Sequence, residues 1–130
     1  LLYSDADTLY HAEPDLDYLS EICPADSLCT FFDRPKFRDE TGFYMHNPQH
    51  PRAKEWANRL EEIYLSGEVW TYEKDRAADQ YTMAFGRDSF KDCKQMDLMT
   101  YHEGVDPKDP VPTSPLNNFL QHLKGEKKTS

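Results

Sequence analysis

Apolar residues fall into short runs that are separated by acidic, proline and glycine breaks, and this pattern predicts short strands alternating with helices. Five runs have the length of a strand and are bounded by polar or turn residues. They are residues 1–4, 27–32, 43–45, 69–72 and 96–101. Residues 33–42 are strongly charged, so we expect a loop between the second and the third strand.

Four other segments repeat apolar residues at helical spacing, and each has a start or a stop signal such as a proline, a polar cap or a glycine. They are residues 14–24, 51–67, 75–86 and 114–125. The helix over 51–67 has one apolar stripe, which we expect to face the core and which consists of Ala53, Trp56, Ala57, Leu60, Ile63 and Tyr64.

Strands that alternate with helices favour the α/β class. The 130 residues fit a single domain over 1–130, with 126–130 as a flexible tail. The chain opens without Met, inside a predicted strand. We therefore interpret it as a fragment of a longer polypeptide.

The formal net charge of -9 makes nucleic acid and anionic membranes poor partners, because their phosphates repel such a chain. An anionic nucleotide remains compatible with this charge if a divalent cation bridges the two. Three cysteines without metal-type spacing, no glycosylation sequon and no transmembrane run favour a cytoplasmic protein with buried thiols.

The first candidate site follows the first strand, where Asp5 and Asp7 are separated by one residue. Ligands of open α/β sheets bind at the carboxyl ends of strands. Two carboxylates that converge there offer the oxygen ligands that a hard cation such as Mn²⁺ or Mg²⁺ prefers. The pair therefore predicts a metal site.

The opening run Leu-Leu-Tyr-Ser-Asp-Ala-Asp-Thr-Leu resembles the Asp-x-Asp strand of GT-A glycosyltransferases, and the order of later features is most like glycosyltransferase family 8, which includes glycogenin and bacterial galactosyltransferases. The resemblance implies a GT-A-like nucleotide-diphospho-sugar transferase fold, with a mixed sheet, flanking helices and a missing N-terminal nucleotide-binding portion. It also implies that the metal bridges the diphosphate of the donor and stabilises the leaving group.

Two more segments match the family in part and are implied to contact the sugar nucleotide. Thr41 and Gly42 stand where the family has its Asn-Ser-Gly strand, which lines the sugar pocket, although only the glycine is shared. Asp79 and Gln80 match the first two residues of the Asp-Gln-Asp motif, and Tyr81 replaces the third. The resemblance assigns Asp79 and Gln80 to the catalytic centre, facing the transferred sugar.

The family ends with His-x-x-Gly-x-x-Lys-Pro-Trp, in which the histidine is the third metal ligand and the lysine contacts the diphosphate. His102 and Lys108 have the spacing of that histidine and lysine, whereas Gly104 comes one residue early and Pro-Trp is replaced. We therefore predict His102 as the third ligand, with Gly104 and Lys108 at the donor. The remaining histidines, including His122, are interpreted as showing no spacing that predicts a site.

Together these features predict a metal-dependent hexosyltransferase that moves a sugar from a nucleotide-diphosphate donor, expected to be a UDP-sugar, to an acceptor hydroxyl. A fragment without the nucleotide-binding portion is expected to bind the donor weakly and to be inactive alone.

Two other functions remain open. A phosphatase of the haloacid dehalogenase type also has an Asp-x-Asp after an apolar strand, but Leu9 stands where that family has a threonine. A non-catalytic acidic binding module, in which Asp5 and Asp7 are simply exposed, is the other alternative.

Overall fold

The computed structural model describes residues 2–4, 8–34, 38–40, 43–68 and 79–122. In chain order the elements are β1 (Leu2–Ser4), β2 (Thr8–Tyr10), α1 (Leu16–Ile22), β3 (Cys29–Phe31), β4 (Asp33–Arg34), β5 (Arg38–Asp39), β6 (Phe43–His46), α2 (Ala53–Leu65), α4 (Asp79–Asp88), β7 (Met96–Asp97), α5 (Leu98–Tyr101), η1 (Pro115–Asn118) and β8 (Leu120–His122). The chain is a mixed α/β protein with small sheets and flanking helices, which confirms the predicted class at this level.

The main sheet has four strands in the order β1-β6-β3-β7. β6 is antiparallel to β1 and β3, while β3 and β7 are parallel. The carboxyl ends of β1, β3 and β7 therefore lie beside the amino end of β6. We call this side the carboxyl edge, defined by Ser4, Phe31, Phe43 and Asp97, since Ser4 pairs with Phe43 and Phe31 with Asp97.

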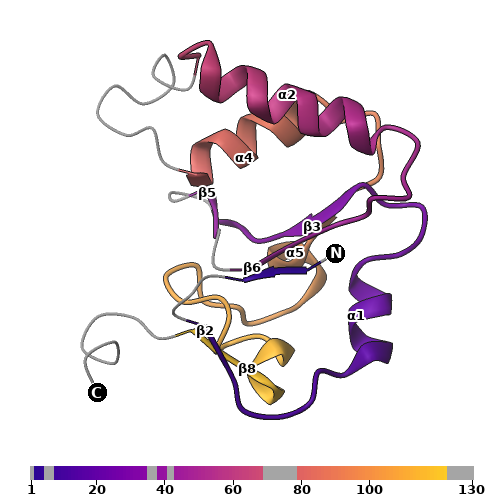
Figure 1. Ribbon diagram of the computed structural model, residues 1–130. Coiled ribbons are helices and arrows are strands. Elements are labelled where there is room, and N and C mark those ends of the chain that lie inside the picture. The colour runs from indigo at the N-terminus through magenta and orange to yellow at the C-terminus, as the bar shows by residue number, and fades with distance from the viewer. Residues whose placement is uncertain (1, 5–7, 35–37, 41–42, 69–78, 123–130) are drawn as a thin grey trace.

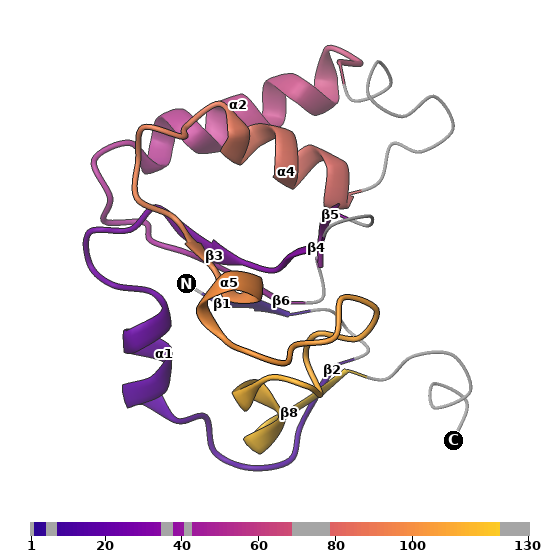
Figure 2. The ribbon, with the colours of Figure 1, turned by 180° about the vertical axis from the view of Figure 1, so that it is seen from behind.

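Each face of the main sheet carries its own core, because side chains alternate along the strands. On one face Phe31 and Tyr44 pack with Trp56 of α2 and with Phe90. The opposite-face core consists of Ile22, Phe32, Phe43, Met45, Leu98, Val111, Leu116, Phe119 and Leu120. Figures 1 and 2 show the resulting layers, with α2 and α4 side by side above the sheet and α1 and the β2–β8 pair below it.

The first two predicted helices are confirmed. In α1, the Asp15 side chain caps the amino end by accepting a hydrogen bond from the Tyr18 amide at 3.1 Å. α2 ends at Leu65, and Gly67 adopts the left-handed conformation with φ 80° that terminates many helices.

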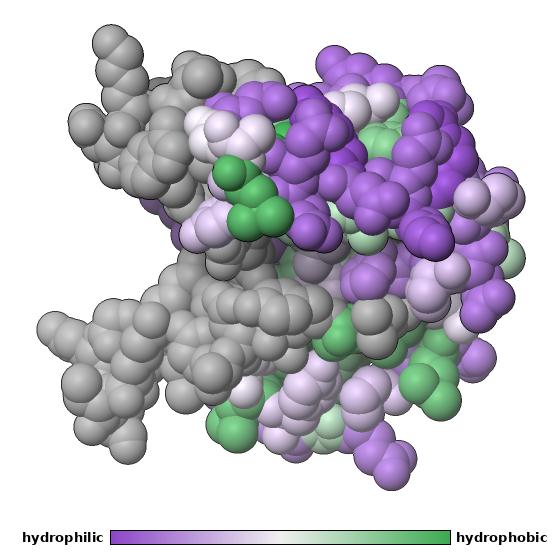
Figure 3. Space-filling model, turned by 45° about the horizontal axis from the view of Figure 1, so that its top comes forward, coloured by the Kyte–Doolittle hydropathy of each residue, from purple (hydrophilic) through white to green (hydrophobic). Residues whose placement is uncertain are grey.

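The apolar stripe of α2 is narrower than predicted. Trp56 and Ile63 are buried, whereas Tyr64 is 54% exposed. Figure 3 looks onto the outer side of this region, where most of the coloured surface is hydrophilic.

The third predicted helix was expected to stop at Gly86, but α4 continues to Asp88. Gly86 serves close packing instead, because a Cβ at this position would overlap Cδ2 of Leu60 on α2. Residues 75–78 and the predicted strand 69–72 lie outside the described residues.

Three other predictions are corrected. The strand over 96–101 ends at Asp97, whose carboxylate accepts the Met99 amide at 3.0 Å and so starts α5. The helix over 114–125 is the 3₁₀ turn η1, followed by β8, because β8 pairs with β2. The charged loop over 33–42 contains the antiparallel β4–β5 hairpin.

Two expectations, on membrane-spanning segments and on the cysteines, can be compared with the structure. Among the residues that the structure describes, none of the helices combines the length and apolar character that crossing a bilayer requires. All three cysteines are free thiols, and Cys29 is buried while Cys23 and Cys93 are half-buried.

Candidate functional site

The predicted acidic motif follows the carboxyl edge directly. Asp5 is the residue after Ser4, and Gly42 precedes Phe43, with which Ser4 pairs. Asp5, Asp7, Thr41 and Gly42 themselves lie outside the described residues. The described part of the edge therefore gives the surroundings of the predicted site.

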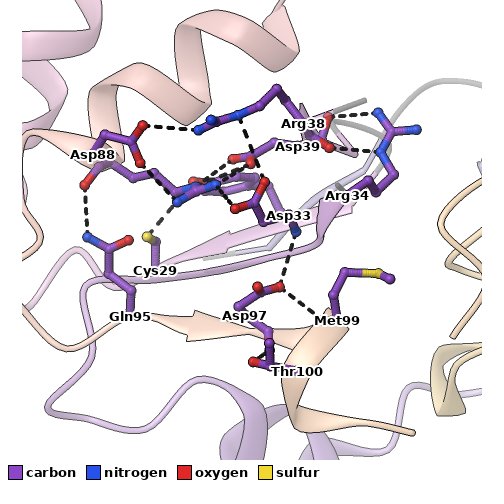
Figure 4. A network of polar contacts seen from close by, with 12 residues as sticks. Cys29, Asp33, Arg34, Arg38, Asp39, Asp88, Gln95, Asp97, Met99 and Thr100 are labelled. Atoms are coloured by element: carbon purple, nitrogen blue, oxygen red, sulfur yellow. Dashed lines mark hydrogen bonds and ion pairs between the residues drawn. The ribbon is translucent and has the colours of Figure 1, made fainter. Parts of the chain in front are cut away.

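A charged network that includes Asp33, Asp39 and Asp88 occupies the β3–β7 half of this edge (Figure 4). Arg87 of α4 contacts all three of these carboxylates. The guanidinium of Arg87 donates to both carboxylate oxygens of Asp39 at 2.9–3.2 Å. Its Nη2 also lies 2.9 Å from Oδ2 of Asp33, and Nη1 lies 3.3 Å from Oδ1 of Asp88. The same guanidinium stacks 4.0 Å above the ring of Phe31.

Two further arginines hold the β4–β5 hairpin. Arg34 donates from Nε to the Arg38 carbonyl at 2.8 Å and from Nη2 to the Asp39 carbonyl at 3.1 Å. Arg38 has a φ of 59°, a left-handed conformation that is uncommon for a residue other than glycine. Its side chain reaches Asp88, with Nη2 3.0 Å from Oδ2.

Asp33, the first residue of β4, is linked to Asp97, the last residue of β7, at this edge. The backbone amide of Asp33 donates to Oδ1 of Asp97 at 3.1 Å. Burial raises the pKa of Asp97, and the two amides that it accepts oppose the rise. The Asp33 carboxylate is 34% exposed, whereas the Asp39 carboxylate is fully buried.

Burial also raises the pKa of Asp39 from its ordinary value of 3.8 to about 6, although hydrogen bonds from Arg87 oppose the rise. The folded protein therefore binds a proton at Asp39 at a pH where the unfolded chain is already ionised. The contribution of Asp39 to stability is greatest at low pH and falls as the pH rises between these two pKa values.

We expect the stability advantage of the wild type over Asp39→Asn to shrink by about 2 kcal/mol between roughly pH 4 and pH 7, because asparagine has no charge to desolvate. Urea unfolding of both proteins across this range measures the difference. Asp26→Asn is the matched control, since Asp26 is an exposed partner of Lys94. A wild-type advantage that grows with pH would place the pKa of Asp39 below 3.8 instead.

His102, the predicted third ligand, is held by aromatic neighbours from α1 and α5. Its Nε2 lies 2.7 Å from the Tyr18 hydroxyl, its ring stacks on Tyr18, and the ring of Tyr101 meets it edge-on. Burial lowers the pKa of His102 below its ordinary value of 6.5, and Glu21 opposes this. A metal at Nε2 would have to displace the tyrosine hydroxyl.

The other residues that were predicted to contact the sugar nucleotide have few described contacts. Lys108 is exposed, and its backbone amide donates to Oδ1 of Asp106 at 2.9 Å. Gly104 has a φ of 75° and would have no atom within 4 Å of an added Cβ. Asp79 and Gln80 begin α4, but their side chains lie outside the described part of the structure.

The β2–β8 pair brings a different histidine to the acidic motif. Thr8, which follows Asp7 directly, is in backbone register with His122. The hydroxyl of Thr8 is buried and has no hydrogen-bond partner among the residues that the structure describes. The structure thus places a position next to Asp7 beside a histidine that the sequence interpretation missed.

A signal for His122 was present in the sequence. His122, Gly125 and Lys128 have the His-x-x-Gly-x-x-Lys spacing without the one-residue shift seen at His102. The interpretation of residues 114–125 as a single helix does not use this spacing, because His122 is not part of the apolar face of that helix.

Comparison with known proteins adds nothing to these geometric observations. No family model, curated protein or solved structure matches this chain. Within the residues that the structure describes, no cluster of three His, Cys, Asp or Glu side chains is arranged to hold a metal ion. Asp5 and Asp7 lie outside the described residues, so the ligand set of Asp5, Asp7 and His102 stays a prediction.

The ligand types that the sequence offers at Asp5, Asp7, Thr8 and His122 suit a hard divalent cation. Asp5 and Asp7 would supply carboxylate oxygens, His122 an imidazole nitrogen, and the buried Thr8 hydroxyl an oxygen that needs a partner. Mn²⁺ accepts such a mixture of oxygen and imidazole ligands.

Proposed function

We propose that this chain is the metal-binding and acceptor-side part of a sugar-nucleotide-dependent glycosyltransferase with a GT-A-like fold. In this proposal Asp5, Asp7 and His122 hold Mn²⁺ or Mg²⁺. The observation that supports it most is the pairing of Thr8 with His122, since it joins the end of the acidic motif to a histidine 115 residues after Asp7. His102 remains a prediction, but its contacts with Tyr18 favour a packing role.

A divalent ion bound there would supply positive charge to the diphosphate of the donor as the sugar–phosphate bond breaks. The protein's own residues would position that charge. Ionised carboxylates at Asp5 and Asp7 provide most of the attraction for the cation, and a neutral imidazole at His122 completes the set. The hydroxyl of Thr8, which has no partner within the described part of the chain, would be available to donate a hydrogen bond to one of these carboxylates.

The sugar side of the proposed site follows from the strand register. Phe43 pairs with Ser4, so Gly42 and Asp5 are each the next residue outward from the same pair. This favours Thr41 and Gly42 as neighbours of the donor. Asp79 and Gln80, at the start of α4, and Lys108 remain proposed contacts of the sugar and the diphosphate, with a UDP-sugar as donor and a hydroxyl as acceptor.

Titration calorimetry of this chain with Mn²⁺ tests the metal site. We expect the wild type to bind the ion and Asp7→Asn to bind it at least tenfold more weakly, because one carboxylate charge is lost. The exposed Asp26→Asn is the control and should bind like the wild type. Equal Mn²⁺ affinity of Asp7→Asn and wild type would remove the metal role of Asp7.

A turnover assay on the full-length protein, together with the Mn²⁺ titration, separates the three candidate functions. Mn²⁺-dependent transfer or hydrolysis of a UDP-sugar supports the glycosyltransferase. Hydrolysis of a generic phosphate monoester would instead support the dehalogenase-type phosphatase. Absence of Mn²⁺ binding in the wild type would favour the non-catalytic module.

A further inference from the structure

Arg87 combines deep burial with an unusual number of anionic partners. Its side chain is 8% exposed, and it contacts carboxylates from three elements, namely Asp33 of β4, Asp39 of β5 and Asp88 of α4. Burial opposes its charge, but the hydrogen bonds to Asp39 and the charges of Asp39 and Asp33 together outweigh burial and raise the pKa of Arg87. Arg87 is therefore a permanent cation inside the protein.

A buried ion network adds little net stability, because the desolvation of the charges offsets most of their attraction. Apolar side chains of similar size would stabilise the fold equally well. The network instead fixes the positions of the carboxylates, because the planar guanidinium binds them through paired hydrogen bonds of defined geometry. Arg87 therefore fixes the position of the segment that carries its partners.

The β4–β5 hairpin is that segment. Each of its strands is only two residues long, and a hairpin of this size has little stability of its own. Arg87 holds both strands, through Asp33 on one and Asp39 on the other. The left-handed conformation of Arg38 is uncommon and is retained only where surrounding contacts support it, and here Nη2 of Arg38 lies 3.0 Å from Oδ2 of Asp88.

The hairpin leads directly into the proposed site. After Asp39, the amide of Glu40 donates to the Phe32 carbonyl at 3.1 Å, and the amide of Phe43 donates to the Glu40 carbonyl at 3.4 Å. Phe43 then pairs with Ser4, the residue before Asp5. A shift of the hairpin would therefore move the start of β6 relative to the acidic motif.

We infer that Arg87 is a positioning residue of the carboxyl edge, which fixes the β4–β5 hairpin and through it the register between the start of β6 and β1. The part of this inference that concerns turnover rests on the proposed function. Its structural part does not, since it depends on the described contacts alone.

Arg87→Lys tests the inference, because lysine keeps the charge and loses the planar fork. We expect the kcat of Mn²⁺-dependent UDP-sugar turnover in the full-length protein to fall about tenfold, with the KM for the donor changed much less, since a misplaced site slows the reacting step. The amides of Glu40 and Phe43 should exchange with deuterium faster than in the wild type, whereas amides of α2 should not.

Arg59→Lys is the matched control. Arg59 also joins two carboxylates, Glu62 and Glu68, but it lies on α2 and has no described bond to the hairpin. It should leave kcat and the exchange of Glu40 and Phe43 unchanged. Adding Asp33→Asn to Arg87→Lys should cause less loss of kcat than the product of the two single effects, because both act on one contact.

The outcomes are distinguishable. If Arg87→Lys lowers the melting temperature but changes kcat no more than Arg59→Lys does, Arg87 is merely structural and the inference is overturned. If the wild type itself shows no Mn²⁺-dependent turnover, the proposed function fails. The inference is then decided by exchange, and unchanged rates at Glu40 and Phe43 would overturn it.

Discussion

His122→Ala is expected to lower Mn²⁺-dependent turnover of a UDP-sugar by about 100-fold, whereas His102→Ala is expected to change it less than about threefold. The reason is the difference in their neighbours. His122 is opposite Thr8, the residue after Asp7, while Nε2 of His102 already meets the Tyr18 hydroxyl. Steady-state kinetics of the full-length protein at several Mn²⁺ concentrations measure both effects.

The metal dependence separates loss of a ligand from loss of structure. If His122 binds the ion, higher Mn²⁺ concentrations should restore part of the activity of His122→Ala, and its melting temperature without metal should remain near that of the wild type. The reverse result, in which His102→Ala loses turnover and His122→Ala keeps it, would restore His102 as the ligand and remove the main support for the proposed site.

The elements that the sequence predicted best are those with local signals. α1 begins after a capping Asp15 and ends before Pro24, and α2 ends before the left-handed Gly67. These caps act within one helical turn, so they are visible in a short stretch of sequence.

The elements that were predicted wrongly depend on partners far along the chain. Leu116, Phe119 and Leu120 have helical spacing. Residues 120–122 nevertheless form the strand β8, because they pair with β2, which lies more than 100 residues earlier in the chain. Gly86 has the appearance of a helix stop, but its role is decided by Leu60 on another helix. The local spacing of apolar residues predicts neither the pairing of β8 with β2 nor the packing of Gly86 against Leu60.

The candidate site follows the same rule. The sequence indicated the acidic pair, because a strand end followed by Asp-x-Asp is a local pattern. It did not indicate that the charged segment 33–42 is partly buried, since the burial of Asp39 requires Arg87, 48 residues later. Charged residues are usually solvated, and only the folded partner shows otherwise.

Trp56→Ala is expected to lower the free energy of unfolding by about 4 kcal/mol, because it removes the side chain that joins α2 to the sheet. Trp56 is 3% exposed, stacks on Tyr44 with 6.1 Å between ring centroids, and lies 5.6 Å from the ring of His46. Its replacement leaves a cavity between the helix and the strands. Urea unfolding followed by circular dichroism measures the loss.

Tyr64→Ala on the same helix is the control that tests the burial of the α2 stripe. Tyr64 belongs to the predicted stripe but is 54% exposed, so its truncation should cost less than about 1 kcal/mol. The better helix propensity of alanine opposes even this loss. Equal costs at the two positions would mean that Tyr64 is covered in solution. A small cost at Trp56 would instead mean that α2 is not held on the sheet by this side chain.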